Sequence, residues 1–426
     1  MILTIHRGSK EIGGTCIELQ SDNSRILIDF GLPLVDENRE QLDSKKIIKQ
    51  SKEELIKKGF LPRIKGLYDN ELPQIDAILL SHPHQDHYGL LSYINPKIPV
   101  YMSRGCKALI EVSYFFGQTN YDLGNIKTVK PWRTFKKGDF TITPYLVDHS
   151  GFDALAYLIE AEGKRIFYSG DFRGHGRKKI LFDNLLKNPP RDIDYLILEG
   201  SMIGRDNGKY GTETDIEKEL INLFKDEEKL FFVACSSQNI DRLVSVYRAC
   251  LKTNRTFVID PYTAFVLDKL KMLSAKIPQY NWNNMKIFFV PNIYTGKMAE
   301  GKSLYKFKSA KISYEDIQSM RNKLVIKDTY MTRTIFGNNK ALNHTELIYS
   351  MWEGYLDDMK QFWEKHEIPI IKVHSSGHAY IAELKSFVQA IKPKYILPNH
   401  TFYPEQYSDL LGKNVLLVKD RQPMVL

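Results

Sequence analysis

Residues 81–89, SHPHQDHYG, place His82, His84, Asp86 and His87 within six positions of the chain. The run follows residues 75–80, IDAILL, an apolar stretch that predicts a buried strand. A single histidine in such a place is usually structural, but four ligand-type residues in the pattern HxHxDH predict a metal site. At this spacing the first two imidazoles can face one ion, while Asp86 and His87 face a second ion a short distance away.

Three more ligand-type residues stand at the ends of strand-like runs: His149 in LVDHSG, Asp171 in FYSGDFR and His400 in ILPNHTF. Asp171 is a carboxylate, which can bridge two cations and leave room for a shared water whose pKa the cations lower. Asp29, which ends RILIDFG, is expected to orient a metal ligand rather than to bind metal itself.

The cysteines offer no alternative metal site. They are far apart and form no CxxC pair, so they indicate neither a thiolate zinc site nor a disulfide framework. Any metal must therefore be held by imidazoles and carboxylates. The four are Cys16, Cys106, Cys235 and Cys250.

In the order of these motifs the sequence resembles the metallo-β-lactamase superfamily, with Asp29, the HxHxDH run, His149 and Asp171 in sequence. The resemblance implies an αββα sandwich, classed as α/β, and two Zn²⁺ ions, with Mn²⁺ as the alternative metal. It also implies a division of the ligands. His82, His84 and His149 would hold one ion, Asp86, His87 and His400 the other, and Asp171 would lie between them.

Three later motifs resemble the β-CASP nucleases of this superfamily, and ribonuclease J most of all. They are Glu199 in LILEGS, residues 374–378 in HSSGH, and His400 in PNH. The resemblance implies a ribonuclease with an inserted β-CASP α/β domain, in which Asp86, Glu199 and His378 are catalytic. By the family rule, a histidine at position 400 favours RNA over DNA. Ribonuclease J proteins generally continue into a further domain, whereas this sequence stops 26 residues after His400. Endonuclease or 5′-exonuclease action and a homo-oligomeric state therefore stay open.

Glu199 and His378 also form a plausible acid pair on chemical grounds. A carboxylate can hold an imidazole in position and keep it protonated for a leaving oxygen. In the alternative interpretation, Glu199 only caps the turn that follows it.

Four residues are candidates for holding a substrate phosphate. His374 and Ser376 flank a glycine-containing turn, and Ser236 and Ser237 precede a predicted helix N-terminus, where backbone N–H groups favour an anion. The two serines of the second pair can equally serve as plain helix caps.

The arrangement of predicted elements suggests one domain interrupted by another. Residues 1–203 and 370–426 would form the metallo-β-lactamase domain, and residues 204–369 the inserted domain, where strands and helices alternate. Thr214 with Glu217 predicts the capping box of its first helix. The charged stretch from about residue 35 to 70 predicts a peripheral surface helix, and Gly163 a hairpin turn.

The net charge of +9 is concentrated in residues 260–340, which hold 14 Lys or Arg and 6 Asp or Glu, a net charge of +8. Aromatic and basic side chains alternate in this window, a combination typical of single-stranded nucleic-acid binding. A solvated face over an aromatic core is the alternative. The residues concerned are Tyr280, Trp282, Tyr294, Lys297, Lys302, Tyr305, Lys306, Phe307, Lys308, Lys311 and Tyr314.

Other functions remain as alternatives. A DNA nuclease of the same family would share these motifs except for the histidine at position 400, and a small-ester hydrolase would share the metal ligands without needing the basic insertion. A non-catalytic binding subunit would be expected to lack the ligands. No apolar run approaches the ~18 residues that span a bilayer, and the first residues, MILTIHRGSK, lack the apolar run of a signal peptide. We therefore expect a cytoplasmic protein that does not bind membranes.

Overall fold

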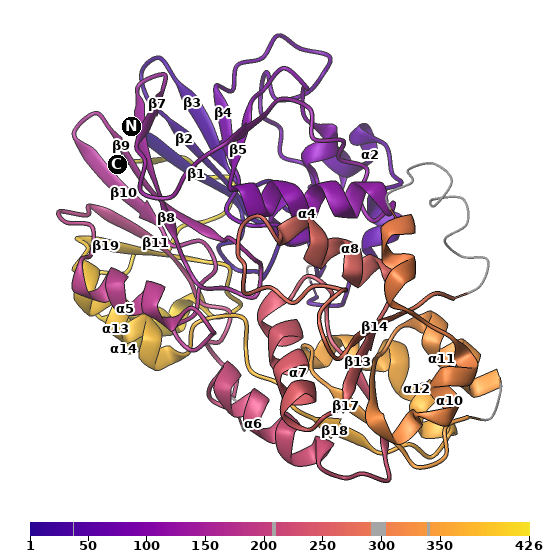
Figure 1. Ribbon diagram of the computed structural model, residues 1–426. Helices are drawn as coiled ribbons and strands as arrows, with labels where there is room; N and C mark the ends of the chain where they lie inside the picture. The colour runs from indigo at the N-terminus through magenta and orange to yellow at the C-terminus, as the bar shows by residue number, and fades with distance from the viewer. Residues whose placement is uncertain (37, 207–209, 291–303, 339–340) are drawn as a thin grey trace. The chain divides into compact units, whose positions relative to one another are not determined.

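The computed structural model describes residues 1–36, 38–206, 210–290, 304–338 and 341–426. The chain divides into two compact units (Figure 1). Unit 1 contains Met1–Asp206 and Gly377–Leu426, and unit 2 contains Asn207–Ser376. Each unit has its own sheets and its own core, so each is described separately.

The first sheet of unit 1 has seven strands in the order β20-β1-β2-β3-β4-β5-β6. Strands β1 to β3 pair antiparallel, as expected for the glycine-broken runs at the N-terminus, and β3 to β6 pair parallel. The strands are β1 (Ile2–Arg7), β2 (Cys16–Gln20), β3 (Arg25–Ile28), β4 (Ala77–Leu79), β5 (Val100–Met102), β6 (Ile126–Thr128) and β20 (Met424–Val425).

The second sheet of unit 1 has six strands in the order β19-β11-β10-β9-β8-β7. The hairpin between β9 and β10 turns at Gly163, whose φ of 72° confirms the predicted turn. The strands are β7 (Phe135–Lys137), β8 (Phe140–Leu146), β9 (Leu155–Ala161), β10 (Lys164–Tyr168), β11 (Tyr195–Glu199) and β19 (Tyr395–Asn399).

The two sheets pack face to face and are covered by helices on their outer faces. Ile28 and Ile197 lie in the core between the sheets, whereas Leu27 packs outward against helices and Leu196 does the same on the other sheet. This alternation follows from the period-2 direction of strand side chains. The resulting layers confirm the predicted αββα sandwich.

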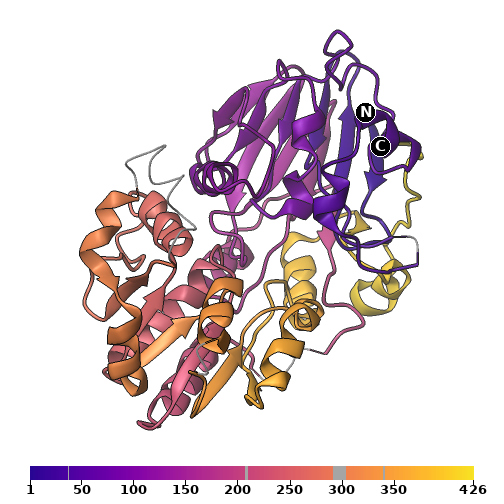
Figure 2. The same ribbon diagram turned by 90° about the vertical axis from the view of Figure 1, so that its right-hand side faces the viewer.

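Helices from both ends of unit 1 form the outer layers (Figures 1 and 2). The layer on the first sheet contains α1 (Ser44–Ile47), α2 (Lys52–Lys57), α3 (Gln85–Tyr88), η1 (Leu91–Tyr93) and α4 (Arg104–Phe115). The layer on the second contains α5 (Lys179–Lys187), α13 (Ile381–Ile391) and α14 (Tyr407–Leu411), the last after η5 (Pro404–Gln406).

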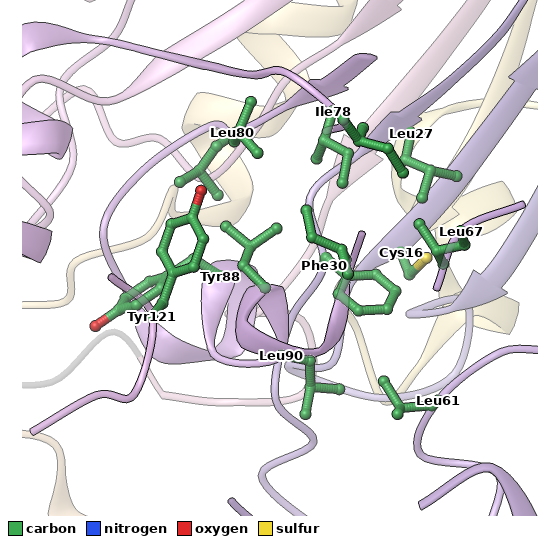
Figure 3. Packing of buried hydrophobic residues seen from close by; sticks show 14 of the residues in the cluster. Cys16, Leu27, Phe30, Leu61, Leu67, Ile78, Leu80, Tyr88, Leu90 and Tyr121 are labelled. Carbon is green, nitrogen blue, oxygen red and sulfur yellow. The ribbon is translucent and has the colours of Figure 1, made fainter. Parts of the chain in front are cut away.

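The predicted surface helix near residues 35–70 is wrong in two respects. It is divided into α1 and α2, because Ser51 begins a new helix by forming a capping box with Glu54. It is also not peripheral, since Ile47 and Leu55 are buried in the same cluster as Leu27 and Ile78 of the sheet. Figure 3 shows this cluster, in which Phe30 and Tyr88 pack beside those strand residues.

Unit 2 is built on one parallel sheet in the order β15-β14-β13-β16-β12-β17-β18. Helices cover both faces, because Phe231 packs against Phe224 of one helix and Phe232 packs against Phe336 and Trp363 of two others. The strands are β12 (Leu230–Ala234), β13 (Thr256–Ile259), β14 (Met285–Phe288), β15 (Lys311–Ile312), β16 (Leu324–Lys327), β17 (Thr345–Tyr349) and β18 (Ile370–Lys372).

The helices of unit 2 fit the predicted alternation of strands and helices. The first helix, α6, begins two residues earlier than expected, because its cap is Thr212, whose side chain accepts from the N–H of Asp215, and not Thr214. The helices are α6 (Glu213–Phe224), α7 (Ile240–Lys252), α8 (Pro261–Leu270), α10 (Tyr314–Ser319), α11 (Tyr330–Asn338) and α12 (Asp357–Lys365). Three 3₁₀ turns accompany them: η2 (Tyr305–Ala310), η3 (Arg321–Lys323) and η4 (Glu353–Tyr355).

The second boundary between the units lies later than the expected residue 370. Strand β18 pairs with β17 and so belongs to the sheet of unit 2, and the chain re-enters unit 1 at Gly377. Among the described residues, none of the helices has the length and apolar character needed to cross a membrane.

We expect Leu55→Ala to lower the free energy of unfolding by about 2–5 kcal/mol, because it leaves a cavity under α2. Leu55 has no exposed surface, whereas Leu72 is 82% exposed. Leu72→Ala should therefore change stability by no more than about 0.5 kcal/mol. Denaturant unfolding measures both variants, and equal effects would mean that α2 is peripheral after all.

Candidate metal centre

All predicted metal ligands lie at the carboxyl ends of unit 1 strands. His82 and its neighbours follow β4, whose end lies beside that of the parallel strand β3. His149, Asp171 and His400 follow β8, β10 and β19, which run in the same direction within the second sheet. Because strands that run in one direction end at one edge, side chains far apart in the sequence meet there.

The turn that carries the HxHxDH run is fixed by close packing. The backbone N–H of Phe30 donates to the carbonyl of His87, and the N–H of Thr15 donates to that of Asp86. A Cβ atom on Gly31 would lie 1.6 Å from the carbonyl oxygen of Asp86, so only glycine permits this approach. The two segments therefore set the position of Asp86 and His87 with little freedom.

One group of ligand atoms belongs to His82, His84 and His149. Nδ1 of His84 lies 3.1 Å from Nε2 of His82 and 3.1 Å from Nε2 of His149. Three imidazole nitrogens thus converge on one point.

A second group belongs to Asp86, His87 and His400. Oδ2 of Asp86 lies 3.7 Å from Nε2 of His87 and 3.6 Å from Nε2 of His400. Asp86 is the most exposed of the three, with 14% of its side-chain surface accessible.

Asp171 lies between the two groups. Its Oδ2 atom is 3.7 Å from Nε2 of His82, 3.1 Å from Nε2 of His87 and 3.5 Å from Nε2 of His400. Both carboxylate oxygens of Asp171 and the Nε2 atoms of His87 and His400 are buried without a hydrogen bond of acceptable geometry to any described residue. Buried polar atoms are rarely left in this state, and atoms of these types arranged around shared points fit two cations.

The remaining nitrogens of the imidazoles are held by neighbours. His87 donates from Nδ1 to Asp29, at 2.8 Å, and His149 donates from Nδ1 to the carbonyl oxygen of Gly377, at 2.6 Å. Nδ1 of His82 lies 3.0 Å from the hydroxyl of Ser81, which itself donates to Asp29. These bonds leave Nε2 of His82, His87 and His149 as the lone-pair atom that faces the centre. His84 faces the centre with Nδ1, and Nδ1 of His400 accepts from the backbone N–H of Gly13 at 3.3 Å.

Asp29 is the main acceptor among the groups that hold these imidazoles in place. Besides His87 it accepts from the Ser81 amide at 2.7 Å, the Ser81 hydroxyl at 2.8 Å and the Tyr168 hydroxyl at 2.7 Å. It is fully buried and adopts φ of 58°, and His400 adopts φ of 53°. Non-glycine residues in this region are uncommon, and they cluster at functional sites.

Four groups that hold the imidazoles or Asp29 in place were not predicted from the sequence: Ser81, Tyr168, Thr15 and the Gly377 carbonyl. Thr15 places its hydroxyl 3.2 Å from Nδ1 of His400. Ser81 adjoins the HxHxDH run and could have been suspected. The others carry no local signal, because a distant hydroxyl or a backbone carbonyl acquires its role only in the fold.

Burial and charge set the protonation of the centre. Burial lowers the pKa of His82 and His149 well below the ordinary value, and lowers that of His84 to about 4, so these rings are neutral at pH 7. Burial opposes ionisation of Asp171, but His400, His87 and His378 hold its pKa well below the ordinary range. Neutral imidazole and ionised carboxylate are the forms that bind metals.

Glu199 and His378 lie next to this centre. Oε2 of Glu199 is 3.3 Å from Nδ1 of His378 and accepts from the Ser201 amide at 3.0 Å, so Glu199 supports both the imidazole and the following turn. Oε1 accepts from the Ala379 amide at 3.1 Å. Burial lowers the pKa of His378, but Glu199 and Asp171 outweigh it and raise the pKa above the ordinary value.

His378 is also close enough to be a ligand, since its ring can join His149 and Asp171 in a third group. Its Nδ1 atom lies 3.7 Å from Oδ2 of Asp171. Geometry alone therefore leaves two roles for His378.

The four candidate phosphate-binding residues lie in unit 2, at or after the carboxyl ends of β12 and β18. Ser236 is exposed and accepts from the Gln238 amide, whereas Ser237 is buried and bonded to the Thr263 hydroxyl at 2.8 Å. Neither serine caps α7, because Asn239 does so. His374 and Ser376 are partly buried.

The basic window is only partly a surface of the predicted kind. Phe307 is fully buried, with Tyr280 packed on it at 4.8 Å, and the partly buried Tyr314 packs on Phe336, so part of this aromatic set belongs to the core. Trp282 packs on Tyr247. Tyr294, Lys297 and Lys302 lie outside the described residues.

Lys308, Lys311 and Tyr305 of the window are exposed, as expected for a nucleic-acid-binding surface. Lys306 forms an ion pair with Asp268, which also pairs with Lys271. Tyr305 is 47% exposed and carries Lys308 over its ring at 4.4 Å, and Lys308 and Lys311 are exposed. A cavity of about 400 Å³ in unit 1, lined by residues such as Tyr93 and Asp122, contains none of the predicted residues.

Comparison with known families and proteins places this geometry in context. Residues 56–217 match the model of the beta-lactamase superfamily domain, and residues 367–412 match the Zn-dependent metallo-hydrolase RNA specificity domain. The first match spans the HxHxDH run, His149, Asp171 and Glu199. The second spans residues 374–378 and His400.

Similar proteins include ribonuclease J of Helicobacter pylori, 24% identical over 97% of this chain and 59% of that protein. Ribonuclease J of Mycoplasma pneumoniae is 21% identical over 93% of this chain and 67% of that protein. The chain thus spans about three fifths of the Helicobacter protein and two thirds of the Mycoplasma protein.

A solved structure of a protein of unknown function from Enterococcus faecalis matches 100% of this chain and 99% of its own, with a TM-score of 0.81 and 20% identity. At that identity the likeness shows the fold. The two domain matches and the relatives show a beta-lactamase superfamily domain and a Zn-dependent metallo-hydrolase RNA specificity domain in a chain that is similar to ribonuclease J.

Proposed function

We propose that the protein is a metal-dependent ribonuclease that hydrolyses RNA phosphodiester bonds, by endonuclease action, 5′-exonuclease action or both. One observation carries the proposal: two groups of buried ligand atoms lie on either side of Asp171. The relatives named ribonuclease J and the match to an RNA specificity domain support RNA as the substrate.

In this proposal His82, His84 and His149 hold one Zn²⁺, and Asp86, His87 and His400 hold the other, with Asp171 shared. Mn²⁺ is the alternative ion. The buried atoms without hydrogen bonds around Asp171 fit this assignment. When bound, such ions would supply positive charge for the phosphate oxygens and would lower the pKa of a water that they hold.

The chain's own side chains move the protons. Asp86 has the exposure needed to accept a proton from the attacking water, which makes it catalytic as well as a ligand. His378, held by Glu199, donates a proton to the leaving oxygen. Its raised pKa keeps the ring protonated closer to neutral pH, which suits a general acid.

We assign unit 2 the role of an inserted β-CASP domain that binds single-stranded RNA. Exposed Lys308 and Lys311 can pair with phosphates, and Tyr305 offers a ring on which a base can stack. Ser237, buried and bonded to Thr263, is a support for this domain rather than a phosphate ligand.

The direct test is to incubate the purified protein with 5′-labelled single-stranded RNA and with DNA of the same sequence, with and without a chelator. We expect cleavage of RNA that the chelator abolishes, and product lengths that distinguish endonuclease from exonuclease action. Preferential cleavage of DNA would make the protein a DNA nuclease. Hydrolysis of small esters without nuclease activity would point to an ester hydrolase.

We expect two metal ions per chain, because seven ligand-type residues surround the centre where one zinc needs three or four. Elemental analysis after reconstitution measures the ratio. A folded protein that binds less than one ion per chain would rule out the two-metal assignment.

We expect His378→Ala to keep both metal ions and most of its RNA affinity, and to slow cleavage by about a hundredfold or more, as loss of a positioned proton donor does. His400→Ala is the matched control, since it removes a ring from the ligand group and should lower the metal content.

An RNA analogue with a sulfur leaving group separates these roles further, because sulfur needs little protonation. It should restore most of the rate to His378→Ala and none to His400→Ala. If His378→Ala loses a metal ion, or if the sulfur substrate restores nothing, His378 belongs to the metal site or to phosphate binding.

We expect the double variant Lys308→Glu and Lys311→Glu to weaken RNA binding and to flatten its salt dependence, by about 0.7 in the log–log slope for each lost phosphate contact. Lys225→Glu with Lys365→Glu is the matched control, since both are exposed lysines of unit 2 outside the basic window. Filter binding at several salt concentrations measures the slope. Equal effects of the two double variants would assign Lys308 and Lys311 to ordinary solvation.

A further inference from the structure

In unit 2, the connections that leave the neighbouring strands β12 and β17 run to opposite sides of the sheet. The chain leaves β12 towards β13 on one side of the sheet, and leaves β17 towards β18 on the other, although β12 and β17 are neighbours. In open α/β sheets ligands bind beyond the carboxyl ends of the strands at such a point. Here these ends carry Ser236, Ser350 and His374.

A single arginine, Arg242 of α7, organises this edge. It is fully buried and forms a two-pronged ion pair with Glu213 of α6, at 2.8 Å from Nη2 and 3.3 Å from Nε. Ser245 donates to the same carboxylate at 2.8 Å. Because Glu213 neutralises it, Arg242 is not itself an available anion ligand.

The other nitrogens of Arg242 reach the ends of β17 and β18. Nη1 donates to the carbonyl of Ser350 at 3.0 Å and also to the Ser350 hydroxyl, and Nη2 donates to the Ser375 hydroxyl at 3.3 Å. The Ser350 hydroxyl in turn donates to the carbonyl of Val373. The first residues after β18 are therefore fixed to the sheet through one guanidinium group.

The same group determines which proton His374 carries. Nη1 of Arg242 lies 3.4 Å from Nδ1 of His374. Nη1 has two hydrogens and also donates to the carbonyl and hydroxyl of Ser350, so the contact to Nδ1 is a shared one. Because a guanidinium group can only donate, this contact favours a lone pair on Nδ1, and the proton of the neutral ring is then on Nε2. A proton on Nδ1 would face a permanent cation.

We propose that Arg242 is a positioning residue that fixes His374 in the Nε2–H form, so that His374 donates a hydrogen bond to a phosphate oxygen of the substrate; this rests on the proposed function. The ligand class is a phosphate or phosphodiester anion. Glu213 holds the arginine in place, and the fork of the guanidinium is needed to reach Glu213, Ser350, His374 and Ser375 together.

The kinetic test uses Arg242→Lys, which keeps the charge but loses the fork. We expect KM for RNA to rise about tenfold with kcat nearly unchanged. This pattern results when a lost contact had stabilised the enzyme–substrate complex and the transition state equally. His374→Ala should show the same pattern, and His374→Gln, whose amide nitrogen can replace Nε2, should be affected less.

Arg255→Lys is the matched control. Arg255 is another buried arginine of unit 2, but it donates to the carbonyls of Phe224, Lys229 and Leu324, before β12 and at the start of β16. It should lower stability without changing KM. If Arg255→Lys raises KM as much as Arg242→Lys does, the effect is general destabilisation and the proposal is wrong.

A measurement on the wild-type protein needs neither a folded variant nor RNA cleavage. In ¹⁵N-labelled full-length protein, two-bond ¹H–¹⁵N spectra distinguish the two forms of a neutral imidazole, and His374→Gln identifies the signal. We expect protonated Nε2, unprotonated Nδ1 and a shift of the Nε2 signal on addition of inorganic phosphate. Protonated Nδ1, or no response to phosphate, would overturn the proposal. Absence of RNA cleavage alone would overturn only the proposed function.

Discussion

The burial of unpaired ligand atoms around Asp171 is the constraint on which the rest of unit 1 depends. Imidazole nitrogens and carboxylate oxygens without hydrogen bonds are costly inside a protein, and here they come from both sheets. Only a rigid frame can hold them together. The frame consists of parallel strand ends that meet at one edge, and of Gly31, which lets the chain after β3 touch the turn at Asp86. Asp29 adds four hydrogen bonds to the same edge.

In an imidazole ring, the hydrogen bond at the nitrogen that faces away from the ligand decides whether the other nitrogen offers a lone pair or a proton. At the metal centre, acceptors such as Asp29 and the Gly377 carbonyl take the Nδ1 proton and leave a lone pair on Nε2. In unit 2 the polarity is reversed, because the donor Arg242 faces Nδ1 of His374 and leaves a proton on Nε2. One side chain type is thereby adapted to a cation in one unit and to an anion in the other.

Much of this could be predicted from the sequence, because the signals are local. A strand followed by HxHxDH brings four ligand-type residues to one turn, and the predicted ligands do converge. The errors occur where tertiary packing decides. Ser51 divides a charged stretch that reads as one helix, and β18 joins the second sheet by pairing with β17. The interleaving of lysines and aromatics could not show that Phe307 is buried and that Lys306 forms an ion pair with Asp268. Arg242 gave no signal, since its partners lie 29 to 133 residues away.

The segment from His374 to Ala379 takes part in two sets of hydrogen bonds, one in each unit, because its residues are consecutive in the chain. Within unit 2, Arg242 holds His374 and Ser375, and within unit 1, His149 and Glu199 hold Gly377 and Ala379. Ser376 alone stands between the two sets of bonds. A Cβ atom on Gly377 would lie 2.4 Å from the Ser150 hydroxyl, so a larger residue does not fit there without displacement. Each part of the HSSGH segment is therefore held by bonds within its own unit, His374 and Ser375 in unit 2 and Gly377 and Ala379 in unit 1. These bonds would be required even if no residue of the motif touched the substrate.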